Sequence, residues 1–380
     1  MDFAFSDEQE QFRKVVRDFA EAEIAPHAEQ WDRDHSFPVD TVLAMGELGL
    51  FGLPFPEEYG GSNADFATLC IAIEELGRVD QSLAITLEAG VGLGANPIFQ
   101  FGTEEQRQTW LPDLVAGRKI AGFGLTEPDA GSDAGGTRTA AALDGNEWVL
   151  NGEKAFITNS GTPITSLVTV TARTGPGEIS AIVVPAGTTG FLVQPPYRKM
   201  GWHASDTHGL SFADARVPAA NLLGARGSGF RQFLSILDEG RIAIAALAVG
   251  VIQCCVEQSV EYAKNRNAFG KAIGANQAVA FACSDLAVMV DAARALVYKA
   301  AWLKDSGRPF KHEAAVAKLY ATEAAVSATR IATQVFGGYG FMDETPVARQ
   351  YRDAKILEIG EGTSEIQRLV IARGLGLPVS

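Results

Sequence analysis

Cysteine and histidine, the usual ligands of zinc, are scarce in this sequence. Its four cysteines include no C-x-x-C pair, and only two of its five histidines, His203 and His208, lie close together. Zinc sites and disulfide frameworks depend on recurrent cysteine or histidine spacings, and neither C-x-x-C nor H-E-x-x-H occurs in the sequence. We therefore expect neither a metal centre nor a disulfide framework.

Basic residues and long apolar runs are also in short supply. The 32 Lys and Arg against 46 Asp and Glu give a formal net charge of -14, which argues against general nucleic-acid or anionic-membrane binding, because either needs a basic surface. No uncharged apolar run approaches the roughly 18 to 20 residues of a membrane span. The N-terminal MDFAFSDEQEQF lacks the basic and apolar regions of a signal peptide. We expect a cytoplasmic protein whose anionic ligands need a local basic site.

What is present is a hydrophobic pattern that changes period twice along the 380 residues. Residues 1–120 are predicted to form a helical domain. Ser6 and Gln9 fit a capping box, after which apolar residues recur at helical spacing. Further helices are expected at 38–49, 63–78, 81–101 and 103–116.

Residues 121–226 predict a small β domain, a barrel or a sandwich. Short runs rich in Val, Ile and Thr alternate with turn residues, as in LVTVTAR, ISAIVVP and GLSFADARVP. Asn151-Gly152, between two strand-like stretches, predicts a hairpin turn.

Residues 227–380 predict a C-terminal bundle of long helices, at 228–264, 275–306, 311–336 and 345–357. The whole chain is therefore expected to be α+β and mainly α.

Four segments are candidates for ligand contact, although no segment fits the Rossmann pattern G-x-G-x-x-G between a strand and a helix. GFGLTEPDAGSDAGG, residues 122–136, would let backbone approach a ligand, but is equally typical of a surface loop. FITNS, 156–160, ends a predicted strand, where such residues are usually structural. NRNAFGK, 265–271, and QVFGGYGF, 334–341, are well explained as helix ends, although Arg266 could grip a phosphate.

The fifth candidate is EIGEGTSEIQR, residues 358–368, which places Glu361 between two glycines. Ser364 with Gln367 predicts a capping box for the last helix. Glu361 is then either an acid that favours the helix dipole or a base that works beside closely approaching backbone.

In order and spacing, LTEPDAGSD, FITN, RxxFGK, QxFGGYGF and EGTSEIQR resemble the acyl-CoA dehydrogenase family over essentially the whole chain. The C-terminal third is most similar to short-chain and short-branched-chain members. The resemblance implies an N-terminal helical domain, a middle β domain and a C-terminal four-helix bundle. It also implies FAD as cofactor, an acyl-CoA substrate and a homotetramer built as a dimer of dimers.

The implied reaction is dehydrogenation of the thioester to the trans-2-enoyl-CoA. Glu361 would take the α proton, a β hydride would pass to flavin N5, and electrons would leave to an electron-transfer flavoprotein. Some members carry the base on a long helix, at the position of Gly240 here, which has no side chain. Glu239 is rotated about 100° from that position on a helix. Many relatives have tyrosine where this chain has Gly360, so the shape of the acyl pocket does not carry over.

The same resemblance assigns the remaining contacts. The flavin would be held by Phe123, Leu125, Thr126, Gly131, Ser132, Phe156, Thr158, Arg266, Phe269, Gln277, Gln334, Gly337, Gly338, Thr363 and Glu365. The CoA thioester would contact Ser132, Asp238, Arg241 and Gly362. Three alternatives stay open: an acyl-CoA oxidase, an acyl-carrier-protein-linked dehydrogenase, and a catalytically silent CoA-binding relative.

Overall fold

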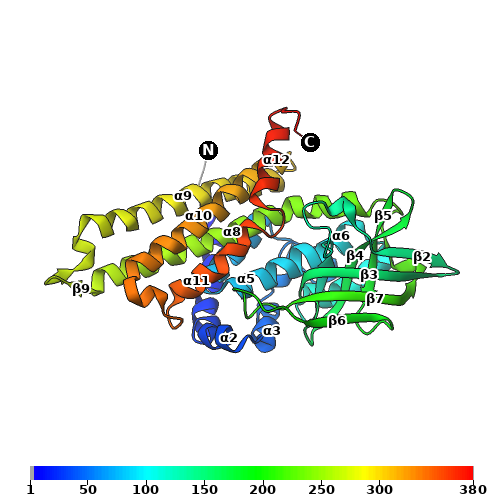
Figure 1. Cartoon of the computed structure of the whole chain (residues 1–380), viewed down its shortest axis with the longest axis horizontal. Coiled ribbons are helices and arrows are strands. Elements are labelled where there is room, and N and C mark those ends of the chain that lie inside the picture. Colours follow the sequence, from blue (N-terminus) through cyan, green and yellow to red (C-terminus); the bar gives the residue numbers. More distant parts are fainter. Residues whose placement is uncertain (1–3, 380) are drawn as a thin grey trace.

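The computed structural model describes residues 4–379. The strands of its large sheet gather at one end of the elongated molecule, and the long helices of the C-terminal part extend toward the other end (Figure 1). The N-terminal helices lie between and beneath these two parts. The predicted α+β, mainly helical fold is confirmed. The domain limits at 1–120, 121–226 and 227–380 stay predictions.

The N-terminal part is helical, as expected. The Ser6 hydroxyl accepts from the backbone amide of Gln9, and the Gln9 side-chain oxygen accepts from the backbone amide of Ser6. These two bonds confirm the capping box. Asp80 likewise caps a helix, accepting from the Leu83 amide at 3.0 Å. The elements are α1 (Asp7–Phe19), a π-helix (Ala20–Ile24), α2 (Ala28–Asp34), α3 (Val39–Glu47), α4 (Phe66–Val79), α5 (Gln81–Glu88), a second π-helix (Ala89–Ala95), α6 (Asn96–Phe101) and α7 (Glu104–Val115).

The single helix expected at 81–101 is three elements. The π-helix Ala89–Ala95 interrupts it, and its glycines allow very close packing. A β-carbon at Gly94 would lie 2.8 Å from the carbonyl oxygen of Ala121, and one at Gly90 would lie 2.6 Å from the Phe51 ring. The second π-helix therefore packs directly against β1 and the 3-10 turn Leu50–Gly52.

The middle part is one predominantly antiparallel sheet. Its strands are β1 (Ile120–Gly124), β2 (Ala140–Asp144), β3 (Glu147–Thr158), β4 (Thr165–Gly175), β5 (Glu178–Pro185), β6 (Phe191–Pro196), β7 (Thr207–Pro218) and β8 (Leu222–Leu223). Their order is β6-β7-β3-β2-β4-β5-β8, and β1 pairs in parallel with β4. The inner face holds a core of its own around Trp148, Leu150 and Val170.

The hairpin turn predicted at Asn151-Gly152 is wrong. Strand β3 runs unbroken through both residues, and the turn falls earlier, between Asp144 and Glu147. Gly152, with φ 146°, instead lies at an irregularity in the pairing of β3 with β7. A β-carbon there would lie 2.6 Å from Cα of Thr139, so the adjacent backbone at Thr139 leaves room only for glycine.

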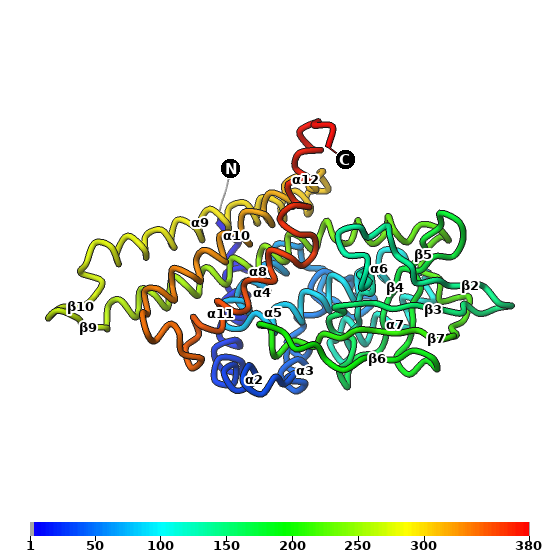
Figure 2. The backbone as a smooth tube through the Cα atoms, viewed as in Figure 1, coloured from blue at the N-terminus to red at the C-terminus, as the bar shows by residue number. Residues whose placement is uncertain are grey.

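The C-terminal part contains α8 (Gly229–Asn265), the short strands β9 (Asn267–Ala268) and β10 (Lys271–Ala272), α9 (Gln277–Asp305), α10 (Lys311–Phe336), α11 (Pro346–Ala354) and α12 (Ser364–Gly374). The first three long helices run side by side and α11 packs on α8 and α10, so the expected bundle is present (Figure 2). Helix α8 is long and apolar enough to cross a bilayer, but 78% of its most apolar window is buried inside the fold. It is thus the central core helix of this part.

The start of α12 differs by one residue from the prediction. Thr363, and not Ser364, is the N-cap, and its hydroxyl accepts from the Ile366 amide at 3.3 Å. Gln367 is therefore not in the capping-box position. Its side chain donates instead to the carbonyl oxygen of Gly362 at 2.8 Å, which ties the helix to the turn that precedes it.

Candidate active site

Glu361 occupies a strained turn between a short 3-10 helix (Lys355–Glu358) and α12. Its φ is 53°, in the left-handed region that a side chain rarely adopts, and Gly362 follows at 94°. The buried Lys318 of α10 donates to the Gly362 carbonyl oxygen at 2.8 Å, as Gln367 does from the other side. The turn is therefore fixed by contacts from two helices.

The carboxylate of Glu361 fits against α8 because residue 240 is glycine. A β-carbon at Gly240 would lie 2.0 Å from Glu361 Oε2. Glu239, the next residue back, faces elsewhere: it accepts from Asn96 Nδ2 at 3.2 Å and from Gln100 Nε2 at 3.0 Å. The long helix thus makes room for Glu361 and offers no base of its own at Gly240.

A second carboxyl group, that of Glu88 at the end of α5, lies beside Glu361. All four oxygens of the two groups are buried, and none has a hydrogen-bond donor among residues 4–379. Burial raises the pKa of Glu361 to about 7, although Lys318 and Arg241 lie near enough to oppose that rise. Burial and the Glu361 carboxyl raise the pKa of Glu88 well above its usual range. Sequence reasoning missed Glu88, whose one signal is an acid inside the apolar stretch SLAITLEAGVGLG.

Glu88 and Gly240 border a cavity of about 100 Å³ between α4, α5, α6, α8 and α9. Most of its wall is apolar, including Phe55, Leu69 and Val91. The wall therefore suits a short hydrocarbon group beside the two carboxyl groups.

The predicted substrate residues Asp238 and Arg241 lie on α8, flanking Gly240. Arg241 is buried and forms an ion pair with Asp238. Lys311 also pairs with Asp238, with its Nζ 3.5 Å from Asp238 Oδ2. Arg241 Nε has no partner among the described residues. A cationic group is thus held next to the position of the base.

The loop after β1 carries Thr126, Gly131 and Ser132, and it is anchored from behind. Buried Lys154 of β3 donates to Glu127 Oε1 at 2.8 Å and to the carbonyl oxygen of Leu125 at 3.3 Å. Leu125 and Glu127 are buried, whereas the intervening Thr126 is half-buried. Gly131 and Ser132 are exposed at the tip of the loop.

Three predicted flavin residues lie on the neighbouring strands. Phe156 has φ 61° and a 65% exposed ring, which tilts against Tyr197. Thr158 ends β3, paired with Thr207 of β7. Phe123 instead stacks on Phe233 of α8, with ring centroids 3.9 Å apart, so its ring helps to join the sheet to the bundle.

The predicted dinucleotide residues form a separate group at the far end of the bundle. Arg266, Gly337 and Gly338 line one cavity of about 520 Å³, and the Arg266 guanidinium lies 5.7 Å from the centroid of the Tyr339 ring. Phe269, between β9 and β10, is 99% exposed. Gln277 and Gln334 are also exposed. The cavity offers a guanidinium and bare glycine backbone, which suit a phosphate.

The structure does not bring the two halves of the predicted flavin site together within one chain. The β9–β10 tip lies at one end of the molecule, and β3 with the loop after β1 lies at the other (Figure 1). Thr363 and Glu365, at the start of α12, lie between these ends. The residue types of both groups suit a dinucleotide, but the two groups lie in separate places within one chain.

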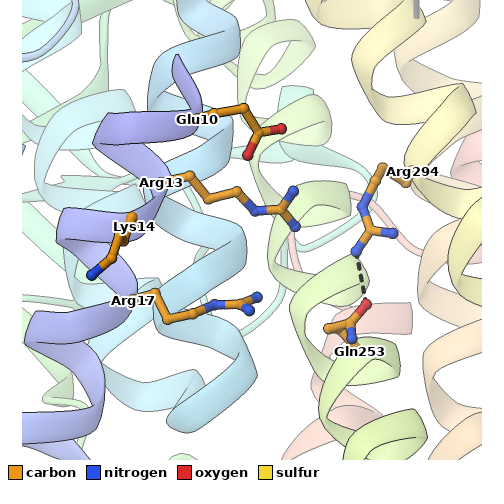
Figure 3. A pocket seen from close by; sticks show the side chains of 6 residues that line it. All are labelled: Glu10, Arg13, Lys14, Arg17, Gln253 and Arg294. Atoms are coloured by element: carbon orange, nitrogen blue, oxygen red, sulfur yellow. Dashed lines mark hydrogen bonds between the residues drawn. The ribbon is translucent and has the colours of Figure 1, made fainter. Parts of the chain in front are cut away.

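A third cleft, whose lining side chains are drawn in Figure 3, has a structural explanation. Guanidinium groups from α1 and α9 converge on two buried carboxylates of α4: Arg13 and Arg294 contact Glu74 at 3.1 and 2.8 Å, and Arg17 contacts Glu75 at 2.8 Å. The cleft, about 370 Å³, is lined by Glu10, Arg13, Lys14, Arg17, Gln253 and Arg294. Its cations already have partners, so the network joins helices. Across residues 4–379, no three His, Cys, Asp or Glu side chains cluster as metal ligands would.

Comparisons with known proteins identify the family of the chain. The chain matches the N-terminal, middle and C-terminal domains described for acyl-CoA dehydrogenases at residues 6–118, 122–215 and 227–376. It is 53% identical to a probable acyl-CoA dehydrogenase of Bacillus subtilis, over 99% of this chain and all of that protein.

Two solved structures are similar over nearly the whole length. Butyryl-CoA dehydrogenase from Megasphaera elsdenii has a TM-score of 0.96 at 43% identity, over 99% of this chain and 100% of that one. A chain in a structure described as the electron transferring flavoprotein of Acidaminococcus fermentans has a TM-score of 0.96 at 42% identity, over 99% of both chains. The chain therefore belongs to the acyl-CoA dehydrogenase family of FAD-dependent oxidoreductases.

Proposed function

We propose that this enzyme dehydrogenates a short acyl-CoA thioester to the trans-2-enoyl-CoA, with Glu361 as the base that takes the α proton. One observation carries the proposal: a buried carboxylate without a hydrogen-bond donor is held against Gly240, beside a small apolar cavity. A carboxylate in such surroundings is a stronger base than one in water, because burial disfavours its charged form.

FAD, when bound, supplies the acceptor for the hydride that leaves the β carbon. Thr126, Phe156 and Thr158 would hold it at the sheet, with Phe123, Leu125, Gly131, Thr363 and Glu365 around them. Arg266, Phe269, Gln277, Gln334, Gly337 and Gly338 would hold the dinucleotide end. The exposed ring of Phe156 and the cavity at Arg266 favour this assignment, but the two groups of residues would have to come from different subunits.

The other residues would bind and orient the thioester. Arg241, buried and paired with Asp238, would face the CoA arm near the base, and Ser132 would meet it at the loop tip. Gly362 would let the backbone approach the thioester closely. The apolar cavity beside Glu88 would take the end of the acyl chain and keep water from the base.

Several finer points belong to the same proposal. The similarity to butyryl-CoA dehydrogenase supports a short acyl chain. The similarity to a chain from the Acidaminococcus structure favours an electron-transferring flavoprotein as the electron acceptor. The acidic charge and the burial of α8 favour a cytoplasmic location.

Anaerobic bleaching of the flavin tests the reaction and its substrate. The purified holoenzyme is mixed with saturated acyl-CoA thioesters from butanoyl to dodecanoyl, and the same acyl groups are offered on acyl-carrier protein. We expect fast bleaching with the shortest CoA thioesters. A rate that rises steadily toward dodecanoyl would contradict the short-chain assignment, and no bleaching with any thioester would contradict the reaction itself.

The electron acceptor needs a second measurement. Reduced enzyme is exposed either to an electron-transferring flavoprotein or to oxygen, and peroxide is measured. We expect fast transfer to the flavoprotein and little peroxide. Stoichiometric peroxide at a rate matching turnover would instead identify an oxidase.

A further inference from the structure

We infer that Glu88 is a positioning residue that shares one proton with Glu361: as the neutral acid of the pair, it donates a hydrogen bond that keeps Glu361 ionised. The inference rests on the proposed function only in treating Glu361 as the base. It concerns the state of the pair before the thioester arrives.

The two carboxyl groups are forced together by the packing of three helices. Glu88 ends α5, where the chain passes into the π-helix Ala89–Ala95. One turn further along the chain, Gly92 leaves space for the Glu88 carboxyl group, because a β-carbon there would lie 3.3 Å from Glu88 Oε1. On the other side, Gly240 of α8 leaves the space that Glu361 Oε2 occupies. Glu88 thus lines the cavity, and Glu361 lies against Gly240 of its wall.

The hydrogen bonds of this pair are incomplete unless it carries a proton. An ionised carboxylate can only accept, and no described N–H or O–H group reaches any of the four buried oxygens. Two ionised carboxylates in contact would also repel each other at low dielectric. A single proton removes the repulsion and supplies the missing donor, as in other paired carboxyl groups.

The surrounding charges decide which residue keeps the proton. Glu361 is faced by Lys318 of α10 and Arg241 of α8, both of which favour its ionised form. Among residues 4–379, no positive charge of this kind contributes at Glu88, where burial and Glu361 itself both favour the protonated form. The other acid on the cavity, Glu239, is occupied by Asn96, Gln100 and Lys304. The proton therefore belongs on Glu88 and the negative charge on Glu361.

This arrangement has a definite consequence for catalysis. Burial raises the pKa of Glu361 to about 7, and a protonated residue is no base. The hydrogen bond from Glu88 stabilises the ionised form and lowers its pKa. Glu88 thus keeps the base available at neutral pH without contacting the α proton.

Infrared difference spectroscopy tests the protonation state without turnover. Spectra of the resting holoenzyme at neutral pH are compared for wild type and Glu88→Gln. We expect the wild type to contain one additional carbonyl stretch of a protonated carboxylic acid. If the substitution removes a carboxylate stretch instead, Glu88 is ionised and the inference is overturned.

The pH dependence of flavin reduction tests the role, with Glu88→Gln and Glu88→Leu as a matched pair. The amide of Gln still donates, so the acid side of the kcat/KM profile should stay near that of wild type. Leu cannot donate, so that side should move up by about one to two pH units, the usual effect of a hydrogen bond to a charged group. Flavin content of both variants checks folding.

Each alternative outcome has a distinct meaning. If both variants move the acid side to lower pH, Glu88 acts as a second negative charge, and if neither moves it, the two residues are not coupled. Either result overturns the inference. If wild type itself is not reduced by any thioester, the proposed function fails, whereas the infrared result still decides whether Glu88 is protonated.

Discussion

At the scale of single residues, Glu361 combines two unfavourable features in one position. A left-handed backbone at a residue other than glycine costs on the order of 1–3 kcal/mol, and its buried carboxylate has no described donor. Such features persist where the surrounding contacts enforce them, here the bonds from Lys318 and Gln367 to Gly362. A residue needed only as a helix cap would not require either feature.

Glu361→Gln should abolish most of the activity while leaving the site intact. Gln keeps the shape of the side chain but cannot take a proton, so flavin bleaching by a thioester should slow by at least about 10²–10⁴, the usual contribution of a positioned general base. Stopped-flow absorbance under anaerobic conditions measures the rate. The control is Glu358→Gln, in the preceding 3-10 helix, where the acid pairs with Lys355. Bleaching at the wild-type rate with flavin bound would show that Glu361 is not the base.

Gly240→Ala offers an independent test on the opposite side of the carboxylate. The added β-carbon would lie 2.0 Å from Glu361 Oε2, so the carboxylate must move. A misplacement of about 1 Å can lower a rate by about 10². We expect kcat to fall by that order in a protein that still binds flavin. An unchanged kcat would mean that the carboxylate acts from another position.

The sequence offered Glu361 and Gly240 as candidates, but it did not offer Glu88. Glu361 lies in EGTSEIQR, and the family resemblance marks Gly240 as the position where some members carry the base. Glu88 is an acid in an apolar run, and such a residue usually marks the solvent side of a helix. Its burial follows from the packing of the π-helix against β1 and of α8 beside it, which no local pattern encodes.

At the scale of elements, the loop after β1 depends on one buried ion pair. Lys154 Nζ also donates to the hydroxyls of Thr137 and Thr171, both at 3.1 Å. Glu127 in turn accepts from the Thr139 amide at 3.0 Å. Because both ends of the loop are bonded to this pair, its exposed tip is carried on a rigid base.

Lys154→Met should destabilise the fold and loosen that loop. It leaves Glu127 buried and without its cation, which typically costs about 3–5 kcal/mol. Urea unfolding measures the loss, and KM for the thioester should rise more than kcat falls. Adding Glu127→Gln removes the stranded charge yet keeps an acceptor for the amides, so the double variant should regain part of the stability. If both variants lose the same stability, the pair does not act as a unit.

The middle sheet shows where local signals become ambiguous. Two dipeptides favour a hairpin turn, Asp144-Gly145 and Asn151-Gly152, only seven residues apart. The chain turns at the first, because β3 must pair with β7 as far as Thr158. The helices were easier to predict, since their periodicity extends over many turns and the capping residues Ser6 and Thr103 mark their starts.

At the scale of the whole molecule, the predicted cofactor site is divided between two distant parts of one chain. The predicted flavin residues on β3 and those beside β9 lie toward opposite ends of the fold (Figures 1 and 2). Aromatic side chains at the Arg266 end are open to solvent, with Phe269 99% and Phe341 85% exposed. Exposed apolar groups around a basic group favour contact with another copy of the chain and its ligand. No sequence pattern fixes such a pairing, because it joins residues of different molecules.

We therefore predict a homotetramer, a dimer of dimers, in which the Arg266 end of one subunit covers the flavin bound at the sheet of its neighbour. Arg266→Ala removes the phosphate-binding guanidinium, so flavin should dissociate and the assembly should weaken. Sedimentation velocity and the flavin-to-protein absorbance ratio measure the two effects together.

The surface substitution Arg118→Ala, at an exposed ion pair with Asp113, should change neither property. Removal of flavin from wild type should weaken the assembly as Arg266→Ala does, because cofactor and partner bind the same surface and each then stabilises the other. A wild-type monomer that retains its full complement of flavin would contradict the shared site, since one chain alone would then hold a dinucleotide that its own two groups of residues are too far apart to grip.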